Sequence, residues 1–225
     1  FIRRSIVRRI FSYVSKILNV RWSIKGVENL KLNESCVLVA NHQNNLDVLG
    51  VSQIYAHLET SCVALANDDC IYSGPFGLCA RLNRFTLINE SDELFSHKNL
   101  LPSKIKQLKH DNVSILIFPE IINNRSDEGI RDFQKSAFIL AIKEQLPIVP
   151  VVFSNYYFID NHRKVFDPGY VTIEAISPIR TDNLSIDDVS KLIEETRNKM
   201  RTTMKKLTAK LTPPSVKELR KQYTF

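Results

Sequence analysis

The chain of 225 residues lacks several patterns that would point to particular classes of protein. It has no apolar run of the roughly 18 or more residues that a transmembrane helix needs. Its four cysteines form no C-x-x-C pair and have no histidine at zinc-ligand spacing, so we expect reduced packing residues and no metal site. Arginines interrupt the opening segment, which excludes the apolar core of a signal peptide. With 44% hydrophobic and 24% charged residues, the composition is that of one globular domain.

The net charge of +7 is unevenly distributed along the chain. Residues 1–26 carry seven basic side chains and no acidic one, and residues 197–225 carry nine basic side chains and one acidic. Residues 27–196 have a net charge of −8. No recognised nucleic-acid-binding motif accompanies the basic ends, so we expect no nucleic-acid partner.

The first 21 residues predict a basic amphipathic helix. Most of its basic residues point away from its apolar ones. The apolar residues recur at helical spacing and are Ile2, Ile6, Ile10, Val14, Ile17 and Leu18. Such a helix can lie on an anionic membrane, with its apolar face among the headgroups. It can equally cover the main domain and leave a solvated outer face, and the sequence leaves both options open. We therefore expect a membrane-associating helix at 1–21, a main domain at 22–211 and a basic tail at 212–225.

Short apolar runs alternate with helical patterns along the rest of the chain. The expected strands cover residues 22–30, where a strand runs into a turn, and then 36–40, 62–66, 85–89, 113–118, 147–153 and 170–176. The expected helices cover residues 46–57, 99–110, 135–144 and 186–211. This alternation predicts an α/β fold, a mostly parallel sheet flanked by helices. Pro147 and Pro150 restrict central pairing of the run at 147–153, which is therefore open to interpretation as a strand bounded by bends.

One segment with possible chemistry follows the expected strand at 36–40. The sequence NHQNNLDVLG places Asn41 and His42 at the carboxyl end of that strand and Asp47 five residues after His42. If Asn44 or Asn45 caps a new helix, Asp47 lies in its first turn and His42 can fold back onto it. A carboxylate that holds one imidazole nitrogen leaves the other as a general base. The alternative is a surface histidine beside a helix-capping acid.

The same segment lacks a nucleophile. No Ser, Cys or Thr lies between Asn41 and Gly50. A base without a neighbouring nucleophile predicts that the group it activates is a hydroxyl of the substrate.

The stretch NHQNNLDVLG resembles the N-H-x-x-x-x-D motif of the 1-acylglycerol-3-phosphate acyltransferases, which belong to the glycerolipid acyltransferase family. Further blocks follow in the family's order: GPFGL at 74–78 resembles the second motif, IFPE at 117–120 the third and PIVPVV at 147–152 the fourth. The stretches around 133–142 and 200–207 resemble the eukaryotic members. The resemblance extends from about Val20 to Leu207 and implies a glycerolipid acyltransferase-like fold.

The resemblance implies an enzyme that transfers an acyl group from acyl-CoA to the sn-2 hydroxyl of lysophosphatidic acid, giving phosphatidic acid. It implies that His42 is the base and that Asp47 orients it. No cofactor is implied besides the co-substrate acyl-CoA, and the implied location is the cytosolic face of the endoplasmic reticulum membrane. The residues that match the acceptor-binding motifs are Gly74, Pro75, Phe76, Gly77, Phe118, Pro119 and Glu120.

This chain departs from the family where an acceptor phosphate is held. Glu90 stands where the family has an arginine, and in the third motif Ile121 and Asn123 replace a glycine and an arginine. A charge-assisted hydrogen bond contributes roughly 1.5 to 3 kcal/mol, so these losses are large enough to abolish useful activity unless other cations compensate. We expect Arg125 to compensate by a shift of the loop, and the other candidates are Arg81, Arg84 and Arg131.

Three interpretations follow from these departures. The first is an active lysophosphatidate acyltransferase with a rearranged phosphate site. The second is an acyltransferase with another glycerolipid acceptor, which predicts an intact base without a basic cluster. The third is a weak or inactive homologue that binds lipid or a protein partner, with its cavity blocked by Ile121 and Ile122. The intact pair of His42 and Asp47 argues against the third.

Overall fold

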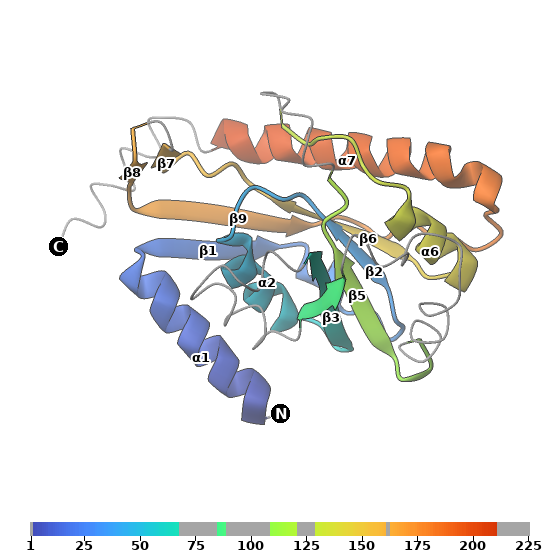
Figure 1. Ribbon diagram of the computed structural model, residues 1–225, viewed down its shortest axis with the longest axis horizontal. Helices are drawn as coiled ribbons and strands as arrows, with labels where there is room; N and C mark the ends of the chain where they lie inside the picture. Colours follow the sequence, from blue (N-terminus) through green and yellow to red (C-terminus); the bar gives the residue numbers. More distant parts are fainter. Residues whose placement is uncertain (1, 68–84, 89–108, 121–128, 161–162, 211–225) are drawn as a thin grey trace.

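A twisted seven-stranded sheet with helices on both faces forms the part of the chain that the structure describes (Figure 1). The computed structural model describes residues 2–67, 85–88, 109–120, 129–160 and 163–210. Its strands occur where the apolar runs predict them: β1 (Val20–Lys25), β2 (Val37–Ala40), β3 (Ser61–Asn67), β4 (Phe85–Ile88), β5 (Val113–Ile117), β6 (Ile148–Phe153) and β9 (Gly169–Ala175). A small separate hairpin of β7 (Ile159–Asp160) and β8 (Val165–Phe166) was not predicted.

The strand order across the sheet is β1-β9-β6-β2-β5-β3-β4. From β6 to β4 all neighbours are parallel, whereas β9 runs antiparallel to β6 and β1 runs parallel to β9. The carboxyl ends of β6, β2 and β5 therefore meet at one edge in the middle of the sheet. The predicted α/β fold with a mostly parallel sheet is confirmed.

Four α-helices in the described part of the chain cover the two faces of the sheet (Figure 1). They are α1 (Ile2–Ile17) and α2 (Asp47–Tyr55) on one face, and α6 (Ser136–Glu144) and α7 (Val189–Lys210) on the other. Two short 3-10 helices, η1 (Val27–Leu30) and η2 (Ile186–Asp188), complete the described elements. Of the predicted helix at 99–110, residues 99–108 lie outside the described ranges.

Alternate residues of β2 divide the core into two layers. Leu38 and Ala40 belong to the cluster beneath α1 and α2, and Val37 and Val39 belong to the cluster beneath α6 and α7. Successive strand residues point to opposite faces, so a strand covered on both sides must be apolar throughout. This requirement explains why the run at 36–40 is continuously hydrophobic. Cys36 and Cys62 are buried, and burial raises the pKa of the Cys36 thiol to about 11.

The interpretation of 147–153 as a strand merely bounded by bends is wrong, because β6 is an interior strand. Pro147 precedes the strand, but Pro150 lies inside it, in register with Val39 of β2. The carbonyl of Pro150 accepts the amide of Ile176, just past the end of β9. The nitrogen of Pro150 points to this same side, so the missing N–H removes no hydrogen bond to β2.

Helix α1 combines features of both alternatives drawn from the sequence. Phe11 and Ser15 are buried against the domain, and the Trp22 indole donates a hydrogen bond to the Ser15 hydroxyl at 3.1 Å. Ile10, Tyr13 and Ile17, in contrast, are 41%, 68% and 70% exposed. The single apolar face predicted for this helix is therefore wrong, because Val14 and Leu18 pack against the core whereas Ile10 and Ile17 point into solvent.

Gly50 allows α2 to lie directly on the sheet. A Cβ atom at this position would lie 2.3 Å from the ring of Phe153 in β6 and 2.8 Å from the ring of Trp22 in β1. Phe153 is fully buried and has no room to move aside. Close contact between α2 and the sheet thus requires glycine here.

We expect Gly50→Ala to lower the free energy of unfolding by about 1–3 kcal/mol, because overpacking at a buried contact outweighs the better helix propensity of alanine. Urea denaturation measures the change. Gln53→Ala, in the same helix, is the matched control, since it improves propensity without the steric conflict and should leave stability nearly unchanged. A Gly50→Ala variant as stable as the parent protein would contradict this account.

Candidate active site

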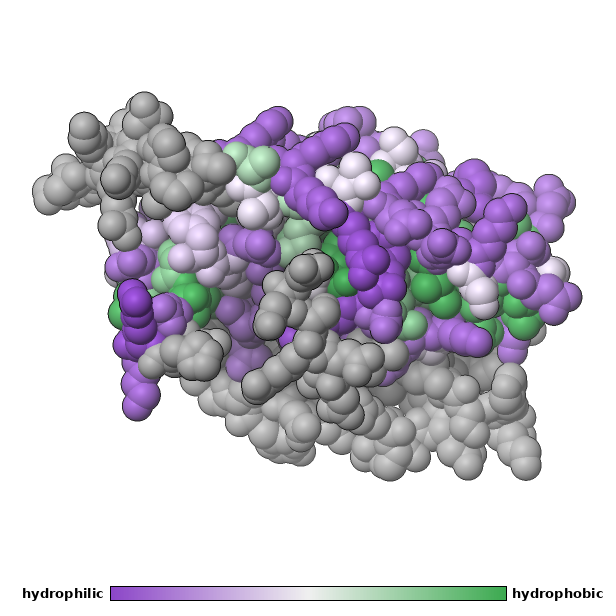
Figure 2. Space-filling model, turned by 90° about the horizontal axis from the view of Figure 1, so that it is seen from above, coloured by the Kyte–Doolittle hydropathy of each residue, from purple (hydrophilic) through white to green (hydrophobic). Residues whose placement is uncertain are grey.

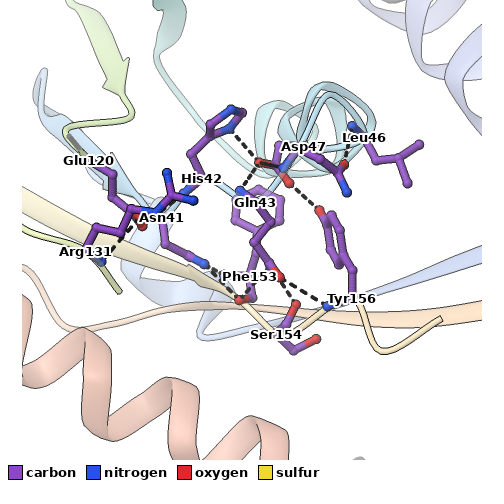
Figure 3. Close-up of polar contacts among 11 residues, drawn as sticks. Asn41, His42, Gln43, Leu46, Asp47, Glu120, Arg131, Phe153, Ser154 and Tyr156 are labelled. Carbon is purple, nitrogen blue, oxygen red and sulfur yellow. Dashed lines mark hydrogen bonds and ion pairs between the residues drawn. The ribbon is translucent and has the colours of Figure 1, made fainter. Parts of the chain in front are cut away.

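Three loops meet at the carboxyl ends of the parallel strands β2, β5 and β6 (Figure 3). They are residues 41–44 after β2, residues 118–120 after β5 and residues 154–156 after β6. These strands are neighbours, so residues that are more than a hundred positions apart in sequence come within hydrogen-bonding distance.

Asn41 joins the first loop to β6. Its side-chain oxygen accepts the amide of Phe153 at 2.7 Å, and its side-chain nitrogen donates to the carbonyl of Phe153 at 3.1 Å. The amide side chain thereby makes the two hydrogen bonds that a neighbouring strand would make. Asn41 is 1% exposed, so a polar residue is tolerated here because both of its polar ends are satisfied.

Gln43 makes a second junction between the same two loops. Its side-chain nitrogen donates to the carbonyl of Ser154 at 2.8 Å and to that of Phe153 at 3.3 Å. Its side-chain oxygen accepts the amide of Tyr156 at 3.1 Å. Asn41 and Gln43 thus hold the backbone on both sides of His42, which restricts where the histidine ring can lie.

His42 points toward Asp47, which begins α2 (Figure 3). Nδ1 of His42 lies 2.8 Å from Oδ2 of Asp47, although the contact does not have the angular geometry of a good hydrogen bond. The turn before the helix brings the two together, because Asn44 Oδ1 accepts the amide of Leu46 at 2.8 Å. The His42 side chain is 39% exposed and that of Asp47 only 2%, so solvent reaches the ring but not the carboxylate.

Asp47 is held by backbone and side-chain donors in addition to His42. Its Oδ2 accepts the amides of Gln43 at 2.8 Å and Asn44 at 3.3 Å. Its Oδ1 accepts the hydroxyl of Tyr156 at 2.5 Å. Burial and the charge of Asp47 raise the pKa of Tyr156 well above 10. The Tyr156 hydroxyl therefore stays protonated at neutral pH and donates a hydrogen bond to Asp47.

The pKa of His42 reflects opposing influences. Burial lowers it, but the close contact with the negatively charged Asp47 carboxylate, together with the charge of Glu120, outweighs burial and raises it above the usual 6.5. Arg131 acts in the lowering direction. Because the pKa is raised on folding, protonated His42 stabilises the protein below pH 6.5, and this contribution is lost as pH rises through the folded-state pKa.

Glu120 joins the loop after β5 to the loop of His42. Its Oε1 accepts the amide of His42 at 3.2 Å, and its Oε2 accepts the amide of Arg131 at 3.4 Å. Burial raises the pKa of Glu120, although the two amides and the Arg131 charge act in the opposite direction. Phe118, from the same loop, lies beside the histidine ring with its centroid 5.3 Å away. Pro119 contributes its carbonyl, which accepts the amide of Gln134 at 2.8 Å.

Several residues proposed from the sequence are therefore brought together: His42, Asp47, Phe118, Pro119 and Glu120. Other candidates lie outside the described residues: Gly74, Pro75, Phe76, Gly77, Arg81, Arg84, Arg125 and the two isoleucines Ile121 and Ile122. Sequence reasoning missed Tyr156 and Gln43 as contacts of this site. Only their position just after a strand end could have pointed to them. Across the described ranges, no cluster of three or more His, Cys, Asp or Glu side chains is arranged to hold a metal ion.

Comparison with known proteins gives a consistent set of similarities. Residues 21–154 match the family model described as Acyltransferase. The chain is 32% identical over 186 residues to human 1-acyl-sn-glycerol-3-phosphate acyltransferase beta, covering 82% of this chain and 65% of that protein. It is 26% identical to the mouse alpha enzyme, over 90% of this chain and 70% of that one.

A solved structure is similar in fold. The crystal structure of the 1-acyl-sn-glycerophosphate acyltransferase PlsC from Thermotoga maritima matches with a TM-score of 0.66 and 20% identity, over 91% of this chain and 79% of that one. At this identity the likeness concerns the fold, and it agrees with the sheet and the flanking helices described above.

Two substitutions should move the pKa of His42 in opposite directions. Asp47→Asn removes the negative charge and leaves burial, so the pKa should fall below 6.5. Tyr156→Phe removes the hydroxyl that shares the charge of Asp47, so more of that charge acts on His42 and its pKa should rise. NMR titration of the imidazole resonances measures both shifts.

His110 provides the internal control, since its Nδ1 also lies near a carboxylate, that of Asp111 at 3.2 Å, but with 88% of its side chain exposed. Its imidazole resonances should be the same in the parent protein and in both variants. Equal His42 titration curves in the parent protein and both variants would rule out this electrostatic account.

Proposed function

Because the chain belongs to the Acyltransferase family, we propose that it transfers an acyl group from acyl-CoA to the sn-2 hydroxyl of 1-acylglycerol-3-phosphate, giving phosphatidic acid. The observation that carries this proposal is the contact of His42 with Asp47 at the carboxyl ends of the central strands. The two relatives named above are acyltransferases for 1-acyl-sn-glycerol-3-phosphate, as their names state.

The proposed mechanism uses His42 as a general base. Asp47 holds Nδ1, which leaves Nε2 facing the acceptor. Nε2 takes the proton of the sn-2 hydroxyl while the oxygen of that hydroxyl attacks the thioester carbonyl carbon of acyl-CoA. The carbon–sulfur bond then breaks, and the CoA sulfur leaves with the proton that His42 had taken up. The proposal requires no covalent acyl-enzyme, in keeping with the lack of Ser, Cys and Thr between Asn41 and Gly50.

Phe118, Pro119 and Glu120 are the described residues that we propose to lie along the acceptor. Gly74, Pro75, Phe76, Gly77 and Arg125 stay predictions for the same role. The second interpretation, a different glycerolipid acceptor, is tested by the same assay when a neutral acceptor is run in parallel.

We further propose that α1 rests on a membrane surface. Ile10, Tyr13 and Ile17 form an exposed apolar stripe at helical spacing, and the exposed Arg9 and Lys16 lie next to them in sequence. The opposite face of the molecule, over α7, is mostly hydrophilic (Figure 2). No helix among the described residues is both long and apolar enough to cross a bilayer. The proposed location is the cytosolic face of the endoplasmic reticulum, in line with the likeness to animal enzymes.

Acyl transfer from labelled acyl-CoA to lysophosphatidic acid tests the proposed reaction. His42→Ala should reduce the rate by about 10² to 10⁴, the range typical of general-base catalysis. The base acts in its neutral form, so kcat/KM should rise with pH through a midpoint above 6.5, and Asp47→Asn should move that midpoint to lower pH.

His110→Ala is the matched control, because it removes a histidine whose nearby carboxylate is solvent-exposed. It should leave the rate unchanged. Folded protein that turns over neither lysophosphatidic acid nor a neutral glycerolipid would favour the interpretation as an inactive homologue.

Vesicle flotation tests the membrane proposal. Changing Ile10 and Ile17 together to Glu should weaken binding to vesicles containing anionic lipid by at least about tenfold, because it removes apolar area and adds charge of the wrong sign. Changing Ile186 to Glu is the control, since Ile186 is a 48% exposed apolar residue in η2, outside α1. Equal binding of both variants and the parent protein would argue against α1 as the contact.

A further inference from the structure

Arg131 brings a positive charge to the site of His42. The acceptor named in the proposed reaction carries its phosphate close to the reacting hydroxyl, separated from it by two carbons and one oxygen. A cation that binds this phosphate must therefore lie in the same site as the base, on the side where the acceptor binds. Among the residues that the structure describes, Arg131 is the cation whose charge acts on His42. Figure 3 shows its guanidinium on the side of His42 where Glu120 lies.

The backbone around Arg131 is fixed from two directions. An isolated antiparallel β-bridge pairs the backbone of Phe133 with that of Glu120, and the amide of Gln134 donates a hydrogen bond to the carbonyl of Pro119. On the other side, α7 holds the residues that flank Arg131. The carbonyl of Ile130 accepts a hydrogen bond from the Arg201 guanidinium at 3.4 Å. The carboxylate of Asp132 forms an ion pair with Arg197 at 2.5 Å.

This anchoring determines the direction of the Arg131 side chain. Asp132 pairs with Arg197 of α7, whereas the Arg131 side chain is turned the other way, toward the site (Figure 3). Glu120 then sets the spacing between base and cation, because one of its oxygens accepts the amide of His42 and the other that of Arg131.

The guanidinium remains available to a ligand. Its contact with Glu120 runs through Nε at a long 3.9 Å, so within the described residues the two terminal nitrogens have no hydrogen-bonding partner. The Arg131 side chain is 28% exposed, whereas that of Glu120 is 5% exposed. Solvent therefore reaches the guanidinium of Arg131 more readily than the carboxylate of Glu120. Paired terminal nitrogens are the geometry that binds two phosphate oxygens at once.

We propose that Arg131 binds the phosphate of the acceptor and makes the site selective for a phosphorylated glycerolipid. This inference rests on the proposed acyl transfer and deepens it. It assigns to Arg131 the role for which Arg125 was expected from the sequence, and it replaces the arginine that the resemblance places at Asn123. Glu120 is the positioning residue that keeps the cation beside His42.

The test compares two acceptors that differ only in the phosphate. Short-chain 1-acylglycerol-3-phosphate and the matching 1-acylglycerol are used below their micelle-forming concentrations, with the full chain. Arg131→Gln should raise KM for the phosphorylated acceptor about tenfold to hundredfold, the loss expected for a charge-assisted hydrogen bond, and leave KM for the neutral one unchanged. Arg131→Lys keeps the charge but not the two-nitrogen geometry, so its KM should fall between those of the parent and of Arg131→Gln.

Arg180→Gln is the matched control. It removes an arginine that pairs with Glu34 and Asp182 and that is 56% exposed. Glu34 lies before β2, whereas His42 follows that strand, so this control alters charge at the opposite end of the sheet. Its kinetics should match those of the parent protein with both acceptors.

A binding measurement separates this proposal from the proposed reaction. In a His42→Ala background, isothermal titration calorimetry with the phosphorylated acceptor should show the same tenfold to hundredfold weakening on Arg131→Gln. If acyl transfer is absent in the parent protein but this weakening is seen, the reaction is wrong and the phosphate site stands. Equal loss with both acceptors, no loss with either, or no binding of the phosphorylated acceptor would overturn the role of Arg131.

Discussion

The buried carboxylate of Asp47 is the constraint around which this site is organised. A carboxylate that is almost wholly removed from water is costly unless donors surround it. Here two backbone amides, the Tyr156 hydroxyl and the His42 ring supply them. Each donor comes from a different local constraint: the turn before α2 supplies the amides, the end of β6 supplies the tyrosine, and the end of β2 supplies the histidine. Parallel pairing of β2 with β6 is what brings these ends to one point.

The fold could be predicted from the sequence because its strands are short apolar runs covered on both faces. Residues 36–40 and 113–118 have this character, and both became interior strands. The direction of β9 could not be predicted in the same way, since an apolar pattern is equally compatible with parallel and antiparallel pairing. The division of α1 into a packed face and an exposed stripe was also missed. Its apolar residues span more than one face, and only the position of the sheet decides which of them are covered.

The candidate site was predicted in part, for a related reason. The contact of His42 with Asp47 is local, so the spacing of five residues was enough to suggest it, although a surface histidine beside a helix-capping acid stayed the alternative. Tyr156 is 109 residues from Asp47, and no short motif connects the two. Arg131 was one of several possible cations, and the others lie outside the described residues. What places Arg131 in the site is the β-bridge of Phe133 to Glu120 and the anchoring of its neighbours to α7.

The antiparallel course of β9 also determines where α1 is attached. Because β1 runs parallel to β9, β1 begins at the end of the sheet where β6 ends, and α1 therefore joins the sheet at the same end as His42 and not at the opposite end. Ser15 of α1 contacts Trp22, the Trp22 ring lies 6.4 Å from that of Tyr156, and Tyr156 donates to Asp47. If α1 rests on a membrane as proposed, the protein acts as an interfacial catalyst, whose rate follows the mole fraction of acceptor in a lipid surface and not its bulk concentration. The reacting hydroxyl would then need to travel only a short distance out of the headgroup layer, and the acyl chain could stay in the membrane throughout turnover.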